Sequence, residues 1–296
     1  MDKGYDYIIV GGGSAGYVIA NRLSADPAIK VLLVEAGARD WNPLLRVPLL
    51  ATFWLRKKYH NWGYQTEPER HLNNRRIDWP RGKVLGGSSA INGMVYTRGN
   101  RGDYDHWAQL GLREWSYDKV LPFFRKSENF EEGTSAFHGG EGELPVTRTP
   151  TVDDRYDAFV EAGRQAGFRA NPDFNGASQD GFGRFHFTIK NGERWSAARS
   201  FITPVLERKN LTVLTNAHLL RVVLANGRAT GVAVKTGSGT STLTADQEVI
   251  LCCGAITSPT ALMLSGIGPA DELRRLGIDV QVDSPQVGRG LQDHLT

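Results

Sequence analysis

The chain has 296 residues, a formal net charge of +3, and 40% apolar and 23% charged residues. This length predicts about two domains and is enough to bury a sizeable core, and the composition is that of an ordinary globular protein. Lys and Arg are spread along the chain without a block that could follow a phosphate backbone, which argues against nucleic-acid binding. No apolar run approaches the roughly 18 residues of a membrane-spanning helix.

The two cysteines are adjacent, at Cys252 and Cys253. A disulfide between neighbouring residues would strain the backbone, so we expect free thiols and a reducing compartment. Residues 1–3 lead directly into the first expected strand, which leaves no room for a signal peptide. The sequence thus predicts a cytoplasmic protein.

Residues 5–36 have the pattern of a strand, a glycine turn, a helix and a second strand. Residues 7–10 are a short apolar run, and residues 11–16 follow at once with G-x-G-x-x-G. Apolar residues then recur at helical spacing as far as residue 23. Residues 31–34 form another buried strand, which ends on Glu35. This order is typical of a dinucleotide-binding βαβ unit.

Each part of this unit has a physical task. Gly11 allows the tight turn, Gly13 lets a pyrophosphate approach the backbone, and Gly16 lets the helix pack closely on the strand. The helix N-terminus offers N–H groups and a partial positive charge to phosphates. Glu35 is placed to accept hydrogen bonds from an adenosine ribose. The pattern predicts a dinucleotide site, in preference to a glycine turn without a ligand, and leaves NAD and FAD both open.

Residues 39–74 form a long irregular segment rich in Trp and Pro. Ordinary loops are shorter, so we expect a functional excursion whose aromatic side chains anchor it rather than contact a substrate. Residues 81–96 contain a second glycine-rich loop, in which Ser88 or Ser89 could cap a following helix. The residues alone leave two interpretations open: a backbone that approaches a flat ring or a phosphate, or a capped helix start.

The rest of the chain alternates between helical and strand patterns. Asn226 and Gly227 between two apolar runs are a strong hairpin signal. Pro122 is expected in the first turn of a short helix, and prolines and aspartates mark a boundary near residue 150. Further helices are expected over residues 155–166, 196–206, 258–266 and 270–276, and strands over residues 185–189, 219–224, 231–234 and 248–253.

Three spans together resemble the glucose–methanol–choline (GMC) oxidoreductases, a family of FAD enzymes. They are the βαβ unit that ends in residues 35–37, the segment 82–92, and residues 254–259 with 265–268. Lesser matches occupy residues 103–107, 138–142, 196–199 and 291–294, so the resemblance covers essentially the whole chain. Within the family, residues 61–62, 66–69 and 73–76 are most similar to choline dehydrogenases and their alcohol-dehydrogenase relatives.

The resemblance implies that the cofactor is FAD rather than NAD. Asn92 stands where some relatives carry a histidine bonded covalently to the flavin, so non-covalent FAD is expected. Val222 is expected to offer its backbone to the adenine, and residues 253–255 to pass near the ribose. The full set of expected cofactor-binding residues is Gly11, Gly13, Ser14, Ala15, Gly16, Glu35, Ala36, Val84, Gly86, Asn92, Gly93, Met94, Val95, Val222 and Gly254.

The same resemblance implies an α/β fold. It consists of a Rossmann-like FAD-binding domain, with the βαβ unit and a three-stranded β-meander, and part of an α+β substrate domain. The FAD-binding domain is expected over residues 1–150 and 200–296, and the partial substrate domain over residues 151–199. Family members are much longer than this chain, and their catalytic histidine lies beyond the position of Thr296. The chain therefore resembles an N-terminal fragment.

Seven histidines are present. None shows a metal-ligand spacing such as H-x-x-x-H, and none lies in a Ser/His/Asp pattern, so the sequence predicts no metal site. Most are expected to be surface or loop residues. We therefore assign no catalytic residue within the 296 residues.

The leading hypothesis is an FAD-dependent alcohol oxidoreductase similar to choline dehydrogenases. It would oxidise choline or another small primary alcohol by hydride transfer to flavin N5. As a fragment the chain is expected to be inactive alone and to expose apolar surface. Two alternatives stay open, a non-catalytic FAD-binding module and an NAD-dependent dehydrogenase. No residue identifies the exact alcohol, the electron acceptor or the oligomeric state, or separates an oxidase from a dehydrogenase.

Overall fold

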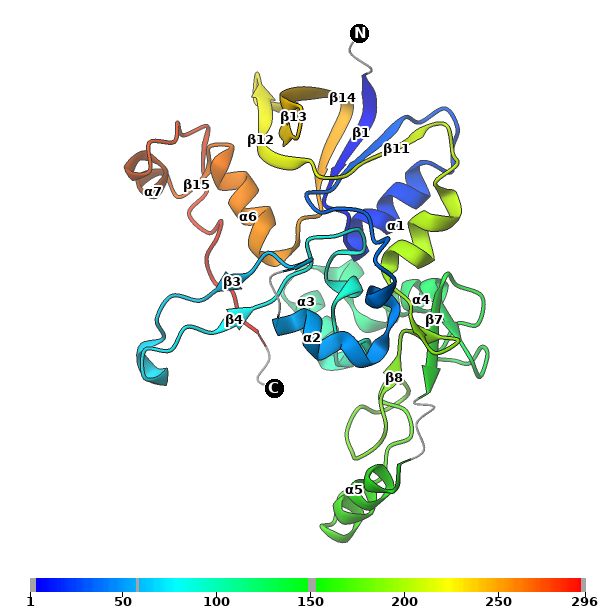
Figure 1. Cartoon of the computed structure of the whole chain (residues 1–296). Coiled ribbons are helices and arrows are strands. Elements are labelled where there is room, and N and C mark those ends of the chain that lie inside the picture. The colour runs from blue at the N-terminus through cyan, green and yellow to red at the C-terminus, as the bar shows by residue number, and fades with distance from the viewer. Residues whose placement is uncertain (1–3, 57–58, 149–152, 294–296) are drawn as a thin grey trace. The chain divides into compact units, whose positions relative to one another are not determined.

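A computed structural model describes residues 4–56, 59–148 and 153–293 (Figure 1). The chain divides into two compact units, and each is described by itself. The first unit comprises Met1–Pro43, Thr52–Ile91 and Ala197–Thr296, and the second comprises Leu44–Ala51 and Asn92–Ser196. None of the helices in the described ranges is long and apolar enough to cross a membrane.

The first unit is built on a six-stranded sheet in the order β11-β2-β1-β14-β13-β12. Its strands are β1 (Tyr5–Val10), β2 (Val31–Val34), β11 (Leu211–Leu214), β12 (His218–Ala225), β13 (Arg228–Thr236) and β14 (Gly239–Leu251). The first four in this order run parallel, and β14, β13 and β12 pair antiparallel as a meander. The predicted βαβ unit, hairpin and three-stranded meander are therefore confirmed.

Two glycines bring helix α1 (Ser14–Leu23) close to β1. Gly11 turns the chain with a φ of 108°, in the left-handed region that favours glycine. A Cβ atom on Gly16 would lie 2.0 Å from the carbonyl oxygen of Gly11, so a residue with a side chain cannot occupy this position without a shift of the helix. The turn and packing roles predicted for these glycines are confirmed.

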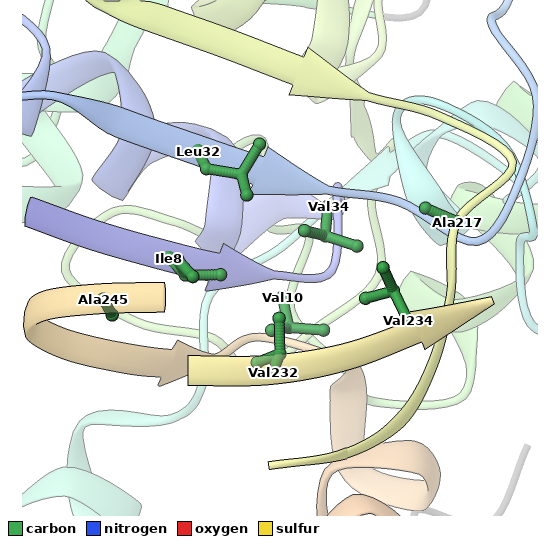
Figure 2. Close-up of a cluster of buried hydrophobic side chains, with 8 residues drawn as sticks. All are labelled: Ile8, Val10, Leu32, Val34, Ala217, Val232, Val234 and Ala245. Atoms are coloured by element: carbon green, nitrogen blue, oxygen red, sulfur yellow. The ribbon is translucent and has the colours of Figure 1, made fainter. Parts of the chain in front are cut away.

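Strand alternation places two sets of apolar side chains on opposite faces of the sheet. On one face, eight residues form a buried cluster between β1, β2 and the meander (Figure 2): Ile8, Val10, Leu32, Val34, Ala217, Val232, Val234 and Ala245. Ile9 and Leu33 point to the other face, and α1 packs on β1 and β2 with Tyr17 fully buried. Both faces of the parallel strands are covered, which explains why their sequences are continuous apolar runs.

Two helix starts differ from the sequence prediction. Helix α4 (Tyr117–Ser127) begins before Pro122, and α6 (Gly254–Leu264) begins before Pro259, so both prolines lie inside helices. The sequence pattern favours proline in the first turn, where its missing N–H has no helical partner to lose. Helix α6 instead starts directly after β14 with Cys253 as its N-cap residue, and Ser258 Oγ accepts the Cys253 N–H at 3.1 Å.

Two further predicted helices are shorter than expected and are not α-helical. Residues 87–90 form only a 3-10 turn, because Gly86 and Gly87 have φ values of 104° and 53° that an α-helix cannot include. Ser88 Oγ accepts the Gly82 N–H, and Ser89 Oγ donates to the Gly86 carbonyl, so neither hydroxyl caps a helix. Residues 198–202 form a π-helical turn that continues into a 3-10 turn at residues 203–205.

The smaller elements of the first unit surround this sheet. They are α6, α7 (Ala270–Arg275), the pair β3 (Tyr64–Gln65) and β4 (Asp78–Trp79), and the pair β15 (Ile267–Gly268) and β16 (Val282–Asp283). A short helix, α2 (Ala51–Arg56), interrupts the segment that the sequence predicts as irregular. The motif match at residues 291–294 extends by one residue beyond the described chain.

The second unit contains a four-stranded sheet in the order β5-β8-β7-β6. Its strands are β5 (Val95–Tyr96), β6 (Glu128–Phe130), β7 (Leu144–Arg148) and β8 (His186–Phe187), with the hairpin β9 (Ile189–Lys190) and β10 (Glu193–Arg194). Its helices are α3 (Arg101–Gln109), α4 and α5 (Asp154–Gln165). Leu110 and Phe123 are each 69% exposed.

Apart from residues 44–51, which belong to the second unit, the unit boundaries lie at residues 91/92 and 196/197. They differ from the predicted domain boundaries near 150 and 200, because β5 pairs with β8 and joins residues 95–96 to the later segment. Residues 149–152, where the sequence places a boundary, lie outside the described residues. The assignment of residues 151–199 to a substrate domain stays a proposal.

Candidate nucleotide-binding site

A pocket of about 600 Å³ opens at the carboxyl ends of three neighbouring parallel strands in the first unit. Val10, Val34 and Leu251, the last residues of β1, β2 and β14, line it. Ligands of open parallel sheets bind at this edge because loops and helix N-termini converge there. The position is that of a nucleotide site in a Rossmann-like fold.

Two helix N-termini reach this pocket. The first residues of α1 (Ser14 and Ala15) and of α6 (Gly254 and Ala255) line it together. Neither helix has a side-chain cap, and neither has an acidic residue in its first turn. Each terminus therefore presents unpaired N–H groups and about +0.5 charge to the same cavity, which favours a bound anion such as a pyrophosphate.

Gly13 leaves open space at the start of α1. A Cβ atom built on this residue would meet no atom within 4 Å, and its φ of −101° would suit residues other than glycine. Neither packing nor backbone conformation within the chain therefore explains the glycine. The property that it adds is room for a ligand against the backbone, as the sequence predicts.

The second glycine loop packs directly on the first. A Cβ atom on Gly87 would lie 2.9 Å from the Cα of Gly13. The Gly86 N–H donates to the Gly12 carbonyl at 3.1 Å and to the Tyr17 hydroxyl at 2.9 Å. Of the two interpretations left open by the sequence, the capped helix start is excluded, and the loop is a backbone segment fixed beside the first glycine turn.

Glu35 is buried beneath these loops. Its Oε2 accepts the Gly12 N–H and its Oε1 accepts the Gly37 N–H, both at 2.7 Å. Burial raises the pKa of Glu35, and the two backbone hydrogen bonds partly offset that rise. Each oxygen retains a lone pair, and the residue lines the pocket, so it can still accept from a ligand hydroxyl. The ribose contact itself stays a prediction.

Sequence reasoning missed Tyr17 and the aromatic wall of the pocket. Tyr17 lies on the buried face of α1, where its spacing signals only core packing, and its hydroxyl bonds the second loop. Trp62 and Tyr64 line the pocket with their rings stacked 5.7 Å apart, and the Tyr64 hydroxyl lies 3.1 Å from Thr257 Oγ1. Both aromatics form part of the cavity, so the expectation that the aromatic side chains of this segment anchor it rather than contact a ligand stays a prediction.

The structure brings about half of the predicted cofactor residues to this pocket. The lining residues among them are Gly11, Gly13, Ser14, Ala15, Glu35, Ala36 and Gly254. Gly16, Val84 and Gly86 lie in the same unit but are not among the lining residues. Asn92, Gly93, Met94 and Val95 belong to the second unit.

Val222 is not placed at the pocket. Its backbone N–H donates to Ser265 Oγ at 2.8 Å, so this N–H is already used within the chain. The residues at the start of β12 that line the pocket are His218 and Leu219, preceded by Ala217. The adenine contact that the resemblance implies for Val222 stays a prediction.

A cluster of buried charges lies in the second unit. Glu128, which is 0% exposed, pairs with Arg98 at 2.9 Å, and His138 Nδ1 lies 3.1 Å from its Oε1. His138 Nε2 lies 3.0 Å from Asp173 Oδ2. Both ring nitrogens face carboxylates, which only accept, so the ring is an imidazolium. Burial alone would lower the pKa of His138, but the hydrogen bonds to Asp173 and Glu128 raise it to about 9.

This cluster is unsuited to two kinds of chemistry. A histidine held as an imidazolium between two carboxylates does not accept a proton from a substrate near neutral pH. Within the described ranges, no group of three or more His, Cys, Asp and Glu side chains could hold a metal ion. The charges of the cluster pair with one another, which is the arrangement expected of a structural network.

The sequence model of the GMC oxidoreductase family matches residues 5–296. The chain belongs to the GMC oxidoreductase family. Its curated relatives include the oxygen-dependent choline dehydrogenases of Sinorhizobium fredii, 48% identical, and of Brucella ovis, 47% identical, each over 290 residues. These matches cover 98% of the chain and 53% of each relative. The chain thus spans about half the length of the curated relatives that it matches.

Solved structures of two oxidases share the fold. The pyridoxine 4-oxidase from Mesorbium loti superposes with a TM-score of 0.94 at 36% identity, over 98% of the chain and 57% of that protein. A formate oxidase variant from Aspergillus oryzae, studied for its FAD modification, superposes with a TM-score of 0.90 at 32% identity. The match covers 99% of the chain and 53% of that protein. The predicted family and its FAD-binding fold are confirmed.

The residues of the pocket fit the adenosine diphosphate part of FAD. Two uncapped helix N-termini suit the pyrophosphate, the open space at Gly13 lets it reach the backbone, and Glu35 can accept from a ribose. The pocket thus has a place for the pyrophosphate and for the adenosine ribose.

Proposed function

We propose that this chain supplies the FAD-binding part of an alcohol-oxidising GMC enzyme similar to choline dehydrogenases. The observation that carries the proposal is the convergence of two uncapped helix N-termini and buried Glu35 on one pocket. The identity of 48% to an oxygen-dependent choline dehydrogenase, over 98% of the chain, supports the choice of family branch.

Three parts of the pocket would hold the adenosine end of FAD. The N–H groups at the starts of α1 and α6 would bind the pyrophosphate, and Glu35 would accept from the ribose hydroxyls. The start of β12 at Leu219 would lie beside the adenine, since it lines the pocket and Val222 does not. Cys252 and Cys253 are free thiols, which supports a reducing, cytoplasmic setting.

The remaining predicted contacts would be to the flavin end. Val84, Gly86 and the turn at residues 92–95 are assigned to it by resemblance to the family. The amide of Asn92 does not form a covalent bond to a flavin as a histidine ring can, so the proposed FAD is non-covalent.

When bound, FAD would supply the hydride acceptor for an alcohol C–H bond. The protein's own contribution would be to bind and orient the cofactor and to exclude water from the nucleotide. Among the described histidines, His138 is held between two carboxylates, and we assign no residue of the chain as the acceptor of the alcohol proton. The proposal therefore expects residues 1–296 to bind flavin without oxidising an alcohol.

Purification of the chain and its visible spectrum test this proposal. We expect bound flavin that heating releases as free FAD, and no bleaching of the flavin when choline is added without oxygen. Bleaching by choline would contradict the expected inactivity and would support choline as the substrate. A colourless protein that binds NADH and not FAD would replace the proposal by the NAD-dependent alternative.

A further inference from the structure

The turn at residues 92–94 in the second unit has an unusual backbone. Met94 has a φ of 63°, in the left-handed region that residues with a Cβ atom rarely occupy, and its side chain is buried. Such a conformation persists only where surrounding contacts determine it. The contacts of this turn are therefore informative about what it is built to do.

Hydrogen bonds hold Met94 from both sides. Its N–H donates to Asn92 Oδ1 at 3.0 Å, and its carbonyl accepts the Thr188 N–H at 2.9 Å. The first bond closes a local turn through the Asn92 side chain, and the second ties the turn to the chain before β9. The conformation of Met94 thus depends on the position of the Asn92 amide.

Arg194 fixes that amide. This arginine is only 2% exposed, and its Nη1 donates to Asn92 Oδ1 at 2.9 Å while its Nε donates to the Leu45 carbonyl at 3.0 Å. Both acceptors are neutral, and burial lowers the pKa of Arg194 to about 10. Burial of a guanidinium costs free energy unless its N–H groups are hydrogen-bonded, so breaking either of these two bonds would destabilise the fold.

The outer side of the turn is open. Gly93 is exposed, its φ lies outside the left-handed region, and a Cβ atom on it would meet no atom within 4 Å. Because two donors converge on Asn92 Oδ1, the Nδ2 group of the same amide points away from the guanidinium. The turn therefore has an inner side held by hydrogen bonds and an outer side where the backbone at Gly93 is uncovered.

We propose that Arg194 is a positioning residue that holds the Asn92–Met94 turn, through Asn92 Oδ1, in the form that contacts the flavin. This inference rests on the proposed function, which assigns residues 92–95 to the flavin. Arg194 itself does not touch the cofactor in this account. It acts by fixing which face of the Asn92 amide the flavin meets.

The test is a double-mutant cycle on FAD affinity in the full chain. Arg194→Lys keeps the charge, but its single ammonium replaces the planar fork that reaches Asn92 and Leu45 together. We expect Arg194→Lys and Asn92→Ala each to raise the FAD dissociation constant about tenfold, and the double variant to be no weaker than Asn92→Ala alone. Effects that multiply to about a hundredfold would overturn the inference, as would an unchanged affinity in Arg194→Lys.

Arg98→Lys is the matched control. Arg98 is also a deeply buried arginine of the second unit, but it pairs with Glu128 and not with the turn. We expect this variant to lower the thermal midpoint while the FAD dissociation constant stays within about twofold. A loss of FAD affinity equal to that of Arg194→Lys would mean that general destabilisation explains both, and would contradict the inference.

Amide hydrogen exchange supplies a readout without the cofactor. In FAD-free protein, Arg194→Lys should speed exchange at Met94, whose N–H is bonded to Asn92 Oδ1, whereas Arg98→Lys should not. Unchanged exchange at Met94 would overturn the inference whatever the FAD result. Failure of the wild-type chain to bind FAD would contradict the proposed function itself. Normal FAD binding by the wild type, with effects of the two variants on the dissociation constant that multiply, would contradict only the role of Arg194.

Discussion

The nucleotide pocket and the buried charge cluster are built from different groups, the first mainly from backbone and the second from charged side chains. The pocket is formed largely by backbone, with glycine turns and two helix N-termini, and Glu35 is a buried carboxylate within its lining. The cluster is formed by charged side chains, in which Glu128 joins Arg98 and His138. The difference shows why one region can accept a ligand: its N–H groups are left without partners in the chain, whereas the cluster satisfies its own charges.

The largest effect is expected from Gly16→Val in the backbone-built region. The new Cβ would lie 2.0 Å from the Gly11 carbonyl oxygen, and backbone cannot move aside as a side chain can. We expect a loss of more than about 5 kcal/mol, enough to prevent folding of a marginally stable domain. Circular dichroism and urea unfolding check this result, with Gly237→Ala as a control, because a Cβ atom there meets nothing within 4 Å. A cooperative, near-native transition for Gly16→Val would refute the packing argument.

Glu128→Gln should have the next largest effect, in the side-chain-built region. It removes the charge that Arg98 and His138 both face, so buried Arg98 loses its carboxylate partner and His138 keeps only Asp173. We expect a loss of about 3–5 kcal/mol in the free energy of unfolding, measured in urea. Glu132→Gln is the comparison, since that exposed carboxylate pairs with Arg148 and should cost about 1 kcal/mol or less. Equal losses in the two variants would show that burial does not matter here.

The same cluster predicts a pH dependence with a definite sign. His138 binds its proton more tightly in the folded protein, where its pKa is about 9, than in the unfolded chain, where it is about 6.5. Its contribution, on the order of 2–3 kcal/mol, is therefore complete below about pH 6.5 and is lost as the pH rises through 9. Urea unfolding between pH 6 and 10 measures the free energy of unfolding as a function of pH. Subtraction of the corresponding curve for His138→Gln removes the contributions of other titrating groups. A difference curve that is flat over this range would contradict the assignment.

Gly13→Ala should have the smallest effect on stability and should separate stability from binding. Its φ is accessible to alanine and the site is open, which favours alanine, whereas the N-cap position of α1 disfavours it, so the free energy of unfolding should change by no more than about 1 kcal/mol. The added methyl group occupies space against the backbone that we assign to the pyrophosphate, so FAD affinity should fall about tenfold or more. Thermal melting and flavin fluorescence measure the two properties on one sample. Unimpaired FAD binding would show that the open space serves another purpose.

The same contrast explains what could be predicted from the sequence. Gly11 and Gly16 have roles that local spacing reveals, because a strand, a tight turn and a helix are consecutive in the chain. The partners Arg98, Glu128 and Asp173 are distant in sequence, so no local pattern announces that they meet. For the same reason the sequence does not predict the hydrogen bond between Arg194 and Asn92. It also gives no sign that His138, expected among surface or loop residues, lies between two carboxylates.

Other errors have local causes. Pro122 and Pro259 indicate helix starts by propensity, but tertiary packing extends both helices toward the N-terminus. Val222 is expected at the adenine from resemblance, which no observation tests; its N–H donates to Ser265 Oγ, and Val222 is not among the residues that line the pocket. The sequence does not mark which residue of an edge strand faces a ligand. Successive residues of a strand differ mainly in the face of the sheet to which their side chains point.

The most direct test of the account compares FAD with FMN, which lacks the adenosine monophosphate part. The pocket at the carboxyl ends of β1, β2 and β14 is assigned to the adenosine diphosphate end of the cofactor. Titration of the flavin-free chain, followed by flavin fluorescence, should therefore show tight binding of FAD, competition by ADP, and little binding of FMN. Binding of FMN as tightly as FAD, or failure of ADP to compete, would contradict the assignment of this pocket.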